Sequence, residues 1–176
     1  HLARDTVAKL ARYDGIQHEM KLDRLDLKLI DALANAGRAS HVELAERIGL
    51  SPTAVARRQR LLEESGVIAG YRAVLGLKTL GMTATVIVRI TLDSQSEEAL
   101  SAFEAAIVTC PSVTRCFLMA GGDDYLVIVV ARDIEDYEHI HKSQLSRLPH
   151  VARIQSSVAL RDVVDRAIPV GATAAG

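Results

Sequence analysis

The feature that most constrains the N-terminal half of this chain is a predicted helix that begins at Ser51. A single residue separates Ser51 from Gly49, which ends the preceding helical segment. A serine such as Ser51 can cap the free N–H groups of a helix, and Pro52 is tolerated in the first helical turn. Gly66 suits the left-handed position that commonly follows a helix. We therefore predict a single helix over residues 51–63.

This helix has two different faces when its residues are placed at 100° per step. The apolar face comprises Ala54, Val55, Leu61 and Leu62. The opposite face comprises Thr53, Ala56, Arg57 and Arg60. A helix with one core face and one basic face fits the major groove of DNA, although a solvated surface helix shows the same pattern.

Two preceding segments favour the DNA-binding interpretation. Residues 22–36 predict a helix with Asp23 as its N-cap, and Ser40 with Glu43 forms a capping box that opens a second helix. Four residues of the second helix are predicted to face inward: Val42, Leu44, Ala45 and Ile48. The short gap before residues 51–63 forces a sharp angle, which is typical of a helix-turn-helix whose last helix is the recognition helix.

The region after Gly66 changes from helical to extended character. Residues 67–75 predict one or two short strands, as a small wing or as a strand leading out of the helices. We expect five regions: an N-terminal extension without assigned function, a helix-turn-helix domain, a linker, a second domain and a loosely held tail. Their ranges are 1–20, 21–70, 71–81, 82–163 and 164–176.

From Met82 onward, apolar residues alternate with a period of two, which predicts strands rather than helices. The predicted strands are 82–92, 113–119, 125–131 and 151–160, and the predicted helices are 96–108 and 133–148. The order β-α-β-β-α-β makes this a ferredoxin-like domain, so the fold class is α+β. The strand over 125–131 is apolar on both faces and is predicted to be central. The sheet face without helices is not fully polar, which predicts dimerisation through this domain.

Charge and motifs narrow the possible functions. Residues 21–80 carry ten Lys or Arg and seven Asp or Glu, so their net charge is positive. Residues 82–176 carry eight Lys or Arg and twelve Asp or Glu, so their net charge is negative. Only the N-terminal domain is therefore expected to bind a polyanion. No apolar run approaches the ~20 residues of a membrane span. No nucleophile elbow, P-loop or zinc-protease motif is present. We therefore expect a cytoplasmic protein that is not an enzyme and does not act at a membrane.

Two local features bear on small ligands. The glycines of residues 121–124 can expose backbone N–H groups to a carboxylate, and Asp123 and Asp124 can hold an ammonium, as an amino acid requires. A plain hairpin turn has the same pattern. His139 and His141 are two apart on a predicted helix and point in different directions, so no metal site is expected.

The chain resembles the Lrp/AsnC (feast/famine) transcriptional regulators from about residue 22 to residue 160. The resemblance lies in residues 22–30, 37–38, 44–45, 50–53, 58, 60, 62–63, 66–71, 121 and 124–125. It implies a winged helix-turn-helix that binds double-stranded DNA, and a ferredoxin-like domain that forms homodimers, often octamers as tetramers of dimers. It further implies that the protein responds to an amino-acid effector, controls genes of amino-acid metabolism and needs no other cofactor.

The resemblance also suggests site residues. The predicted DNA contacts are Arg38, Ser40, Ser51, Thr53, Arg57, Arg58 and Arg60. The predicted effector contacts are Met119, Gly121, Gly122, Asp123, Asp124, Tyr125 and Ser156. Helical placement leaves a second interpretation for Arg58, an ion-paired structural arginine. Two other functions remain open, an enzyme of amino-acid metabolism with a regulatory domain, and an amino-acid-sensing interaction protein or regulatory domain that does not bind DNA.

Overall fold

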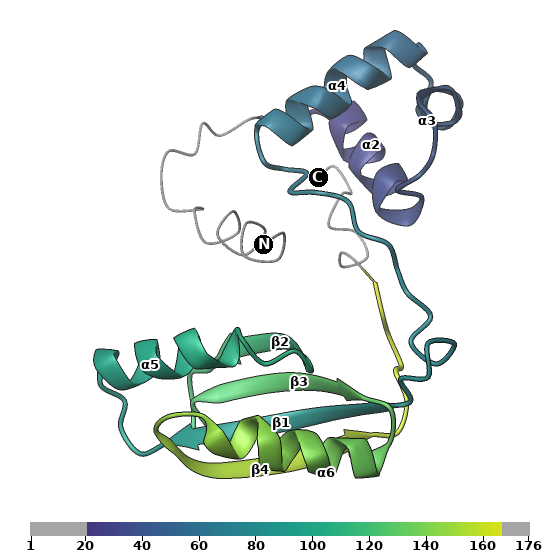
Figure 1. The fold of residues 1–176 in the computed structure, drawn as a ribbon. Coiled ribbons are helices and arrows are strands. Elements are labelled where there is room, and N and C mark those ends of the chain that lie inside the picture. The colour runs from purple at the N-terminus through teal and green to yellow at the C-terminus, as the bar shows by residue number, and fades with distance from the viewer. Residues whose placement is uncertain (1–20, 167–176) are drawn as a thin grey trace. The chain divides into compact units, whose positions relative to one another are not determined.

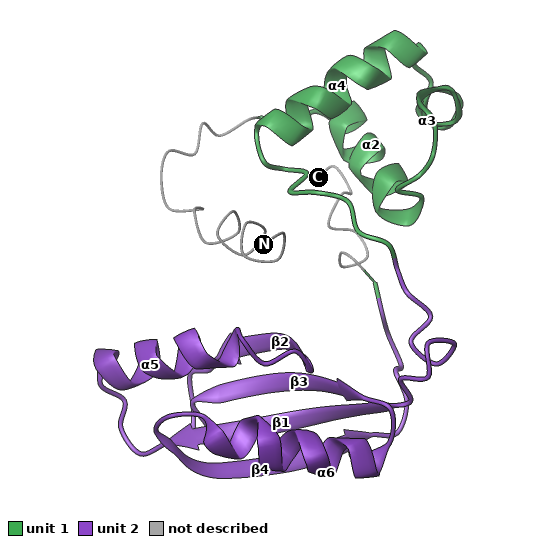
Figure 2. Cartoon of the chain, viewed as in Figure 1, with its two compact units in different colours: residues 1–73, 166–176 green, residues 74–165 purple. Residues whose placement is uncertain are grey.

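The computed structural model describes residues 21–166, so the extension predicted over 1–20 and most of the predicted tail lie outside the described residues. The described chain divides into two compact units, the first comprising residues 21–73 and 166 and the second comprising residues 74–165 (Figure 2). No helix in this part of the chain is long and apolar enough to cross a membrane.

The first unit is a bundle of three helices (Figure 1): α2 (Arg24–Asn35), α3 (His41–Ile48) and α4 (Pro52–Glu64). The predicted caps are confirmed. The Asp23 carboxylate accepts from two backbone N–H groups of α2, and the hydroxyls of Ser40 and Ser51 each accept from one, in α3 and α4. Gly49 and Gly66 have φ angles of 75° and 76°, as the left-handed positions after α3 and α4 require.

The core of the first unit lies where the three helices meet. Its fully buried side chains are Leu29, Leu44, Val55 and Leu62. The predicted inward position of Val42 is wrong, because Val42 is 56% exposed and lies 200° around the helix from Leu44. The predicted apolar face of α4 is also narrower than expected, since Leu61 is 42% exposed.

The segment after α4 differs from its prediction. The strands expected over residues 67–75 are not formed. The Tyr71 hydroxyl instead donates to Oε1 of Glu63 at 2.7 Å and accepts from Nε2 of Gln59 at 2.8 Å. Because both partners lie on α4, Tyr71 fastens the start of the following segment to that helix.

The second unit confirms the β-α-β-β-α-β order. Its elements are β1 (Ala84–Leu92), α5 (Glu97–Ile107), β2 (Val113–Leu118), β3 (Tyr125–Ala131), α6 (Ile134–Ser143), the 3-10 helix η1 (Leu145–Arg147) and β4 (Val151–Ala159). The sheet order is β2-β3-β1-β4 with every pair antiparallel, so β3 is central as predicted. The helix expected over 133–148 is divided into α6 and η1.

One face of this sheet is covered and the other is open. Alternate residues of β1 and β3, including Val88 and Val127, are buried under side chains of α5 and α6 such as Phe103 and Ile140. The residues between them on β1 and β3 face the other side, where no helix of this unit covers them. Its half-buried apolar side chains are Ile87, Leu126, Ile128 and Val130. The uncovered face is therefore largely apolar at its centre.

Candidate DNA-binding and effector sites

The predicted recognition helix, α4, presents two arginines to solvent. Arg57 and Arg60 are exposed, and neither forms an ion pair with any of residues 21–166. Thr53, in the first turn of the same helix, is also exposed, and that turn contains no acidic residue. The outer side of α4 can therefore meet a polyanion without first breaking internal contacts.

Arg58 has a different environment from its neighbours. Its Nη1 donates to Oδ1 of Asp26 at 2.6 Å and to Oδ2 of Asp23 at 2.8 Å, and only 18% of its side chain is exposed. The hydrogen bond to Asp26, followed by that to Asp23, raises the pKa of Arg58 above its usual value. Arg58 thus joins α4 to the start of α2, as the ion-paired interpretation of this residue requires.

The other predicted DNA contacts lie at the starts of helices. Arg38 is exposed in the turn between α2 and α3. Ser40 exchanges hydrogen bonds with Glu43, and the Ser40 backbone N–H at 2.7 Å is the main reason that the pKa of Glu43 is lowered. The Ser51 hydroxyl accepts from the N–H of Ala54 at 3.2 Å. Both serine hydroxyls are thus already engaged in helix caps.

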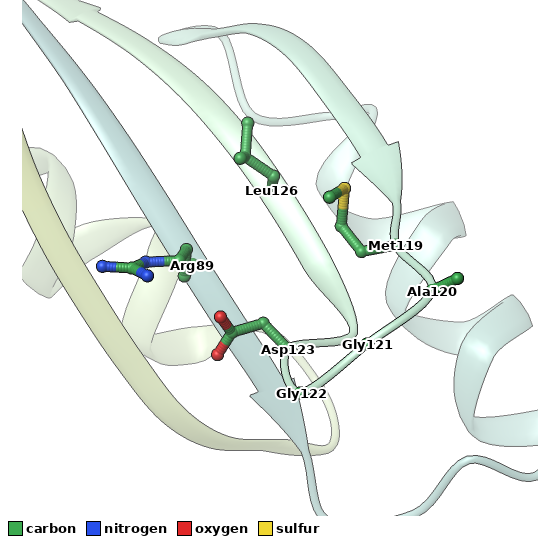
Figure 3. Close-up of a pocket in the computed structure, with 7 residues that line it drawn as sticks. All are labelled: Arg89, Met119, Ala120, Gly121, Gly122, Asp123 and Leu126. Atoms are coloured by element: carbon green, nitrogen blue, oxygen red, sulfur yellow. The ribbon is translucent and has the colours of Figure 1, made fainter.

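The loop between β2 and β3 forms a pocket on the second unit (Figure 3). It is open to solvent and is lined by Arg89, Met119, Ala120, Gly121, Gly122, Asp123 and Leu126. Four of the predicted effector residues therefore gather here: Met119, Gly121, Gly122 and Asp123. Gly121 has a φ angle of 150°, so a residue without a side chain is required at that point of the loop.

The structure places the other predicted effector residues elsewhere. The buried carboxylate of Asp124 accepts from the N–H of Leu92 at 2.7 Å and from Nε2 of Gln95 at 2.8 Å. These bonds tie the end of the loop to β1 and to the residues that follow it. Asp124 is absent from the pocket lining, and its oxygens are occupied by partners within the protein.

Two further predicted residues belong to the covered side of the sheet. Tyr125 is 1% exposed, and its hydroxyl donates to Glu104 at 2.9 Å. Burial, then the hydrogen bond to Glu104, raises the pKa of Tyr125. The Ser156 hydroxyl is hydrogen-bonded to the hydroxyl of Tyr137 on α6. Structural contacts account for both side chains.

Arg89 was not identified as a site residue from the sequence. It lies on β1 between two buried residues, so its side chain is on the uncovered face of the sheet, where it lines the pocket. The available signal was that Arg89 is the one charged residue of β1 and lies at an outward position of that strand. Within residues 21–166 no group of three His, Cys, Asp or Glu side chains could hold a metal ion.

Two known families match the chain, one on each side of the boundary between the two compact units. The winged helix-turn-helix DNA-binding family matches residues 22–69, and the Lrp/AsnC ligand binding domain family matches residues 85–169. The first match contains α2, α3 and α4, and the second contains nearly the whole sheet and the loop pocket.

Curated relatives share both parts. The Bkd operon transcriptional regulator of Pseudomonas aeruginosa is 42% identical over 149 residues, which cover 85% of this chain and 97% of the relative. The proline dehydrogenase transcriptional activator of Rhodobacter capsulatus is 40% identical over 148 residues, covering 84% and 96% of the two chains.

Solved structures agree with the fold. A transcriptional regulator from Neisseria meningitidis in complex with L-Met has a TM-score of 0.81 at 29% identity, covering 85% of this chain and 97% of that one. An AsnC family transcriptional regulator from Agrobacterium tumefaciens has a TM-score of 0.80 at 31% identity, with the same coverage.

Proposed function

Since the chain belongs to the Lrp/AsnC family of DNA-binding transcriptional regulators, we propose that an amino acid bound in its loop pocket controls how it occupies DNA. The observation that carries this proposal is the pocket itself, in which flexible glycine backbone, Asp123 and Arg89 surround an apolar floor. The similar Neisseria meningitidis regulator was solved with L-Met, which supports an amino acid as the class of ligand.

The DNA interface of the proposal is the outer side of α4. Arg57 and Arg60 neutralise phosphates, while Thr53 and Ser51 approach the duplex at the first turn of the helix. Arg38 and Ser40 reach the backbone from the start of α3. Each phosphate contact releases counterions, so affinity falls steeply as salt is raised. In a dimer, two such helices meet half-sites in successive major grooves.

The proposed assembly is a homodimer formed through the uncovered sheet face, with four dimers joining into an octamer. Its support is the row of half-buried apolar side chains on β1 and β3, because apolar side chains that gather on an uncovered face commonly mark an interaction surface. Light scattering should give about eight times the 19.0 kDa mass of one chain. Ile128→Glu should shift the protein toward the monomer, and a monomeric parent protein would contradict the proposed assembly.

The test of the effector function has two stages. A thermal-shift screen with the twenty amino acids should identify at least one that raises the melting temperature, because a ligand that binds the folded state stabilises it. Fluorescence anisotropy with DNA from upstream of the protein's own gene should then show tight binding that this amino acid changes. The proposal fails if no amino acid binds, or if the one that binds leaves DNA binding unaltered.

A further inference from the structure

Tyr71 is the last residue of the segment after α4 that is bonded to the first unit. Its hydroxyl donates to Oε1 of Glu63 at 2.7 Å and accepts from Nε2 of Gln59 at 2.8 Å. A Cβ atom on Gly37 would lie 4.0 Å from Cδ1 of Tyr71, so the tyrosine ring lies against the turn after α2. Tyr71 is therefore held both by α4 and by a second part of the same unit.

The three polar side chains of this contact bond to one another. Gln59 donates to Oε1 of Glu63 at 3.1 Å as well as to the hydroxyl of Tyr71. The hydrogen bond from Tyr71 is the main reason that the pKa of the Glu63 carboxyl is lowered. Glu63 is therefore an ionised acceptor at neutral pH, and a hydrogen bond to an ionised acceptor is stronger than one between neutral groups.

The residues that follow Tyr71 have no comparable contacts. Residues 72–75, which we call the tether, make no hydrogen bond or ion pair with any other residue in the described part of the chain. All of them are exposed, and Val74 is 94% exposed. Hydrogen bonds resume at Gly76, whose carbonyl accepts from the N–H of Leu80 at 3.1 Å. Tyr71 thus sets the point at which the tether begins.

Without Tyr71, the nearest earlier attachment is Ile68. Its N–H donates to the carbonyl of Leu62 at 2.9 Å, and its side chain packs against the core of the first unit. Release of Tyr71 would therefore lengthen the tether from residues 72–75 to residues 69–75. Each extended residue spans up to ~3.3–3.6 Å, so the three added residues give about 10 Å of further reach. That is the length of about three base pairs of duplex.

We propose that Tyr71 determines which spacing between two DNA half-sites the dimer accepts, because its bonds to α4 fix the length of the tether. This inference rests on the binding of two half-sites proposed above. A short tether confines the second recognition helix near one spacing, whereas a longer one spreads it over several. Effective concentration falls roughly as the −3/2 power of tether length, so release should weaken binding at the preferred spacing only about twofold. Tyr71 is a positioning residue and contacts no DNA in this proposal.

Fluorescence anisotropy with duplexes of different half-site spacing tests the proposal. The probe is the palindromic duplex that the parent protein enriches from a random duplex library, with base pairs added at its centre. For the parent protein, adding about three base pairs should weaken binding about tenfold or more. Tyr71→Phe keeps the ring but loses both hydrogen bonds, so it should bind this longer duplex about threefold or more tighter than the parent protein does. A duplex with a single half-site should bind both proteins equally.

Two further variants separate tether length from other effects of substitution. Val74→Thr is the matched control, because Val74 lies within the tether and bonds to nothing in the described residues. It should keep the spacing preference of the parent protein. Three glycines inserted after Arg72 lengthen the tether while Tyr71 stays bonded to α4. This insertion should reproduce the broader spacing preference of Tyr71→Phe.

Digestion with trypsin tests the anchor without DNA. Trypsin cleaves after arginine, and Arg72 is exposed directly beside Tyr71. Cleavage requires residues on both sides of the bond to be released, so its rate reports how often Tyr71 leaves α4. Mass spectrometry of the fragments should show cleavage after Arg72 about threefold or more faster in Tyr71→Phe than in the parent protein. Val74→Thr should be cleaved there at the parent rate.

The outcomes separate this inference from the function on which it rests. If the parent protein enriches no duplex with two half-sites, the proposed DNA binding fails and the inference fails with it. The inference alone fails if Tyr71→Phe keeps the parent spacing preference, if it is cleaved no faster after Arg72, or if the glycine insertion changes nothing. It also fails if Tyr71→Phe weakens the single half-site as much as the paired one, because Tyr71 then supports the recognition helix itself. A spacing preference broadened equally by Val74→Thr would likewise overturn it.

Discussion

Replacing Arg58 by methionine should weaken the first unit without removing a DNA contact. Methionine retains much of the length of the side chain but lacks the bonds to Asp26 and Asp23. A hydrogen bond between charged groups contributes ~1.5–3 kcal/mol, and Asp26 is left buried without its partner. The Asp23 side chain is 51% exposed, so its share is small. We expect a loss of about 2 kcal/mol in the free energy of unfolding of this unit.

Hydrogen exchange can localise this loss, because the chain contains two units and a single unfolding curve would mix them. A loss of about 2 kcal/mol should lower the protection of the slowest amides in α2 and α4 roughly 30-fold. Protection in β1 and β3 should be unchanged. Fluorescence anisotropy over a range of salt concentrations should give the same salt dependence of DNA affinity as the parent protein.

Arg57→Ala is the matched comparison, because Arg57 is exposed and unpaired within the described residues. It should leave amide protection within about 0.5 kcal/mol of the parent protein. Its salt slope should fall by about 0.9 for each phosphate that the variant no longer neutralises. The proposed role of Arg58 is refuted if Arg58→Met keeps full protection in α2 and α4 and instead shows this reduced slope, because Arg58 would then bind phosphate.

Three other predictions concern single side chains. Burial and then Glu63 raise the pKa of Tyr71 to about 12, so its contribution to stability is present below pH 10 and lost as pH rises through 12. The difference in phenolate absorbance between the parent protein and Tyr71→Phe reports the ionisation of Tyr71, and its midpoint should lie near pH 12. A midpoint near pH 10 would contradict this prediction. Phe103→Ala should cost ~3–5 kcal/mol in urea unfolding of the second unit, and a loss below ~1 kcal/mol would show a poorly packed site. The two carboxylate oxygens of Asp124 accept from the N–H of Leu92 and from Nε2 of Gln95, whereas the amide in Asp124→Asn has only one oxygen acceptor. It should lower the melting temperature by the equivalent of ~1–3 kcal/mol, and an unchanged melting temperature would argue against the buried bonds.

The helices and strands were predictable because their signals are local. A capping residue such as Ser40 or Ser51 acts on N–H groups within three residues of itself, so the helix starts can be read from short windows. The period of two in β1 and β3 likewise reports on one sheet face at a time. When the helices and strands predicted from these short windows are taken in chain order, they give the β-α-β-β-α-β order.

The failures in the first unit depend on contacts between distant residues. Residues 67–75 have the β-branched and aromatic composition of a strand, yet no partner strand is present among the described residues to complete one. Tyr71 instead bonds to α4, eight residues back at Glu63. Helical placement did indicate an ion-paired Arg58, but its partner Asp26 lies 32 residues away and could not be identified from a short window.

The candidate effector site shows the same limit. A sequence pattern cannot tell which of Asp123 and Asp124 faces a pocket, because the answer depends on the donors supplied by Leu92 and Gln95. Arg89 is far from the loop in the sequence and reaches it only because β1 pairs with β3. Four of the seven predicted effector residues line the pocket, and the other three are held by structural contacts.

The division of labour between Asp123 and Asp124 has a consequence for how such a regulator diversifies. In the proposed site, the anchoring residue and the residue that contacts the effector lie in neighbouring codons but in separate networks of bonds. A single nucleotide change in the codon for Asp123 could therefore retune which metabolite is sensed while the hairpin keeps its shape. Duplicated genes could drift apart in what they respond to without first losing a folded product.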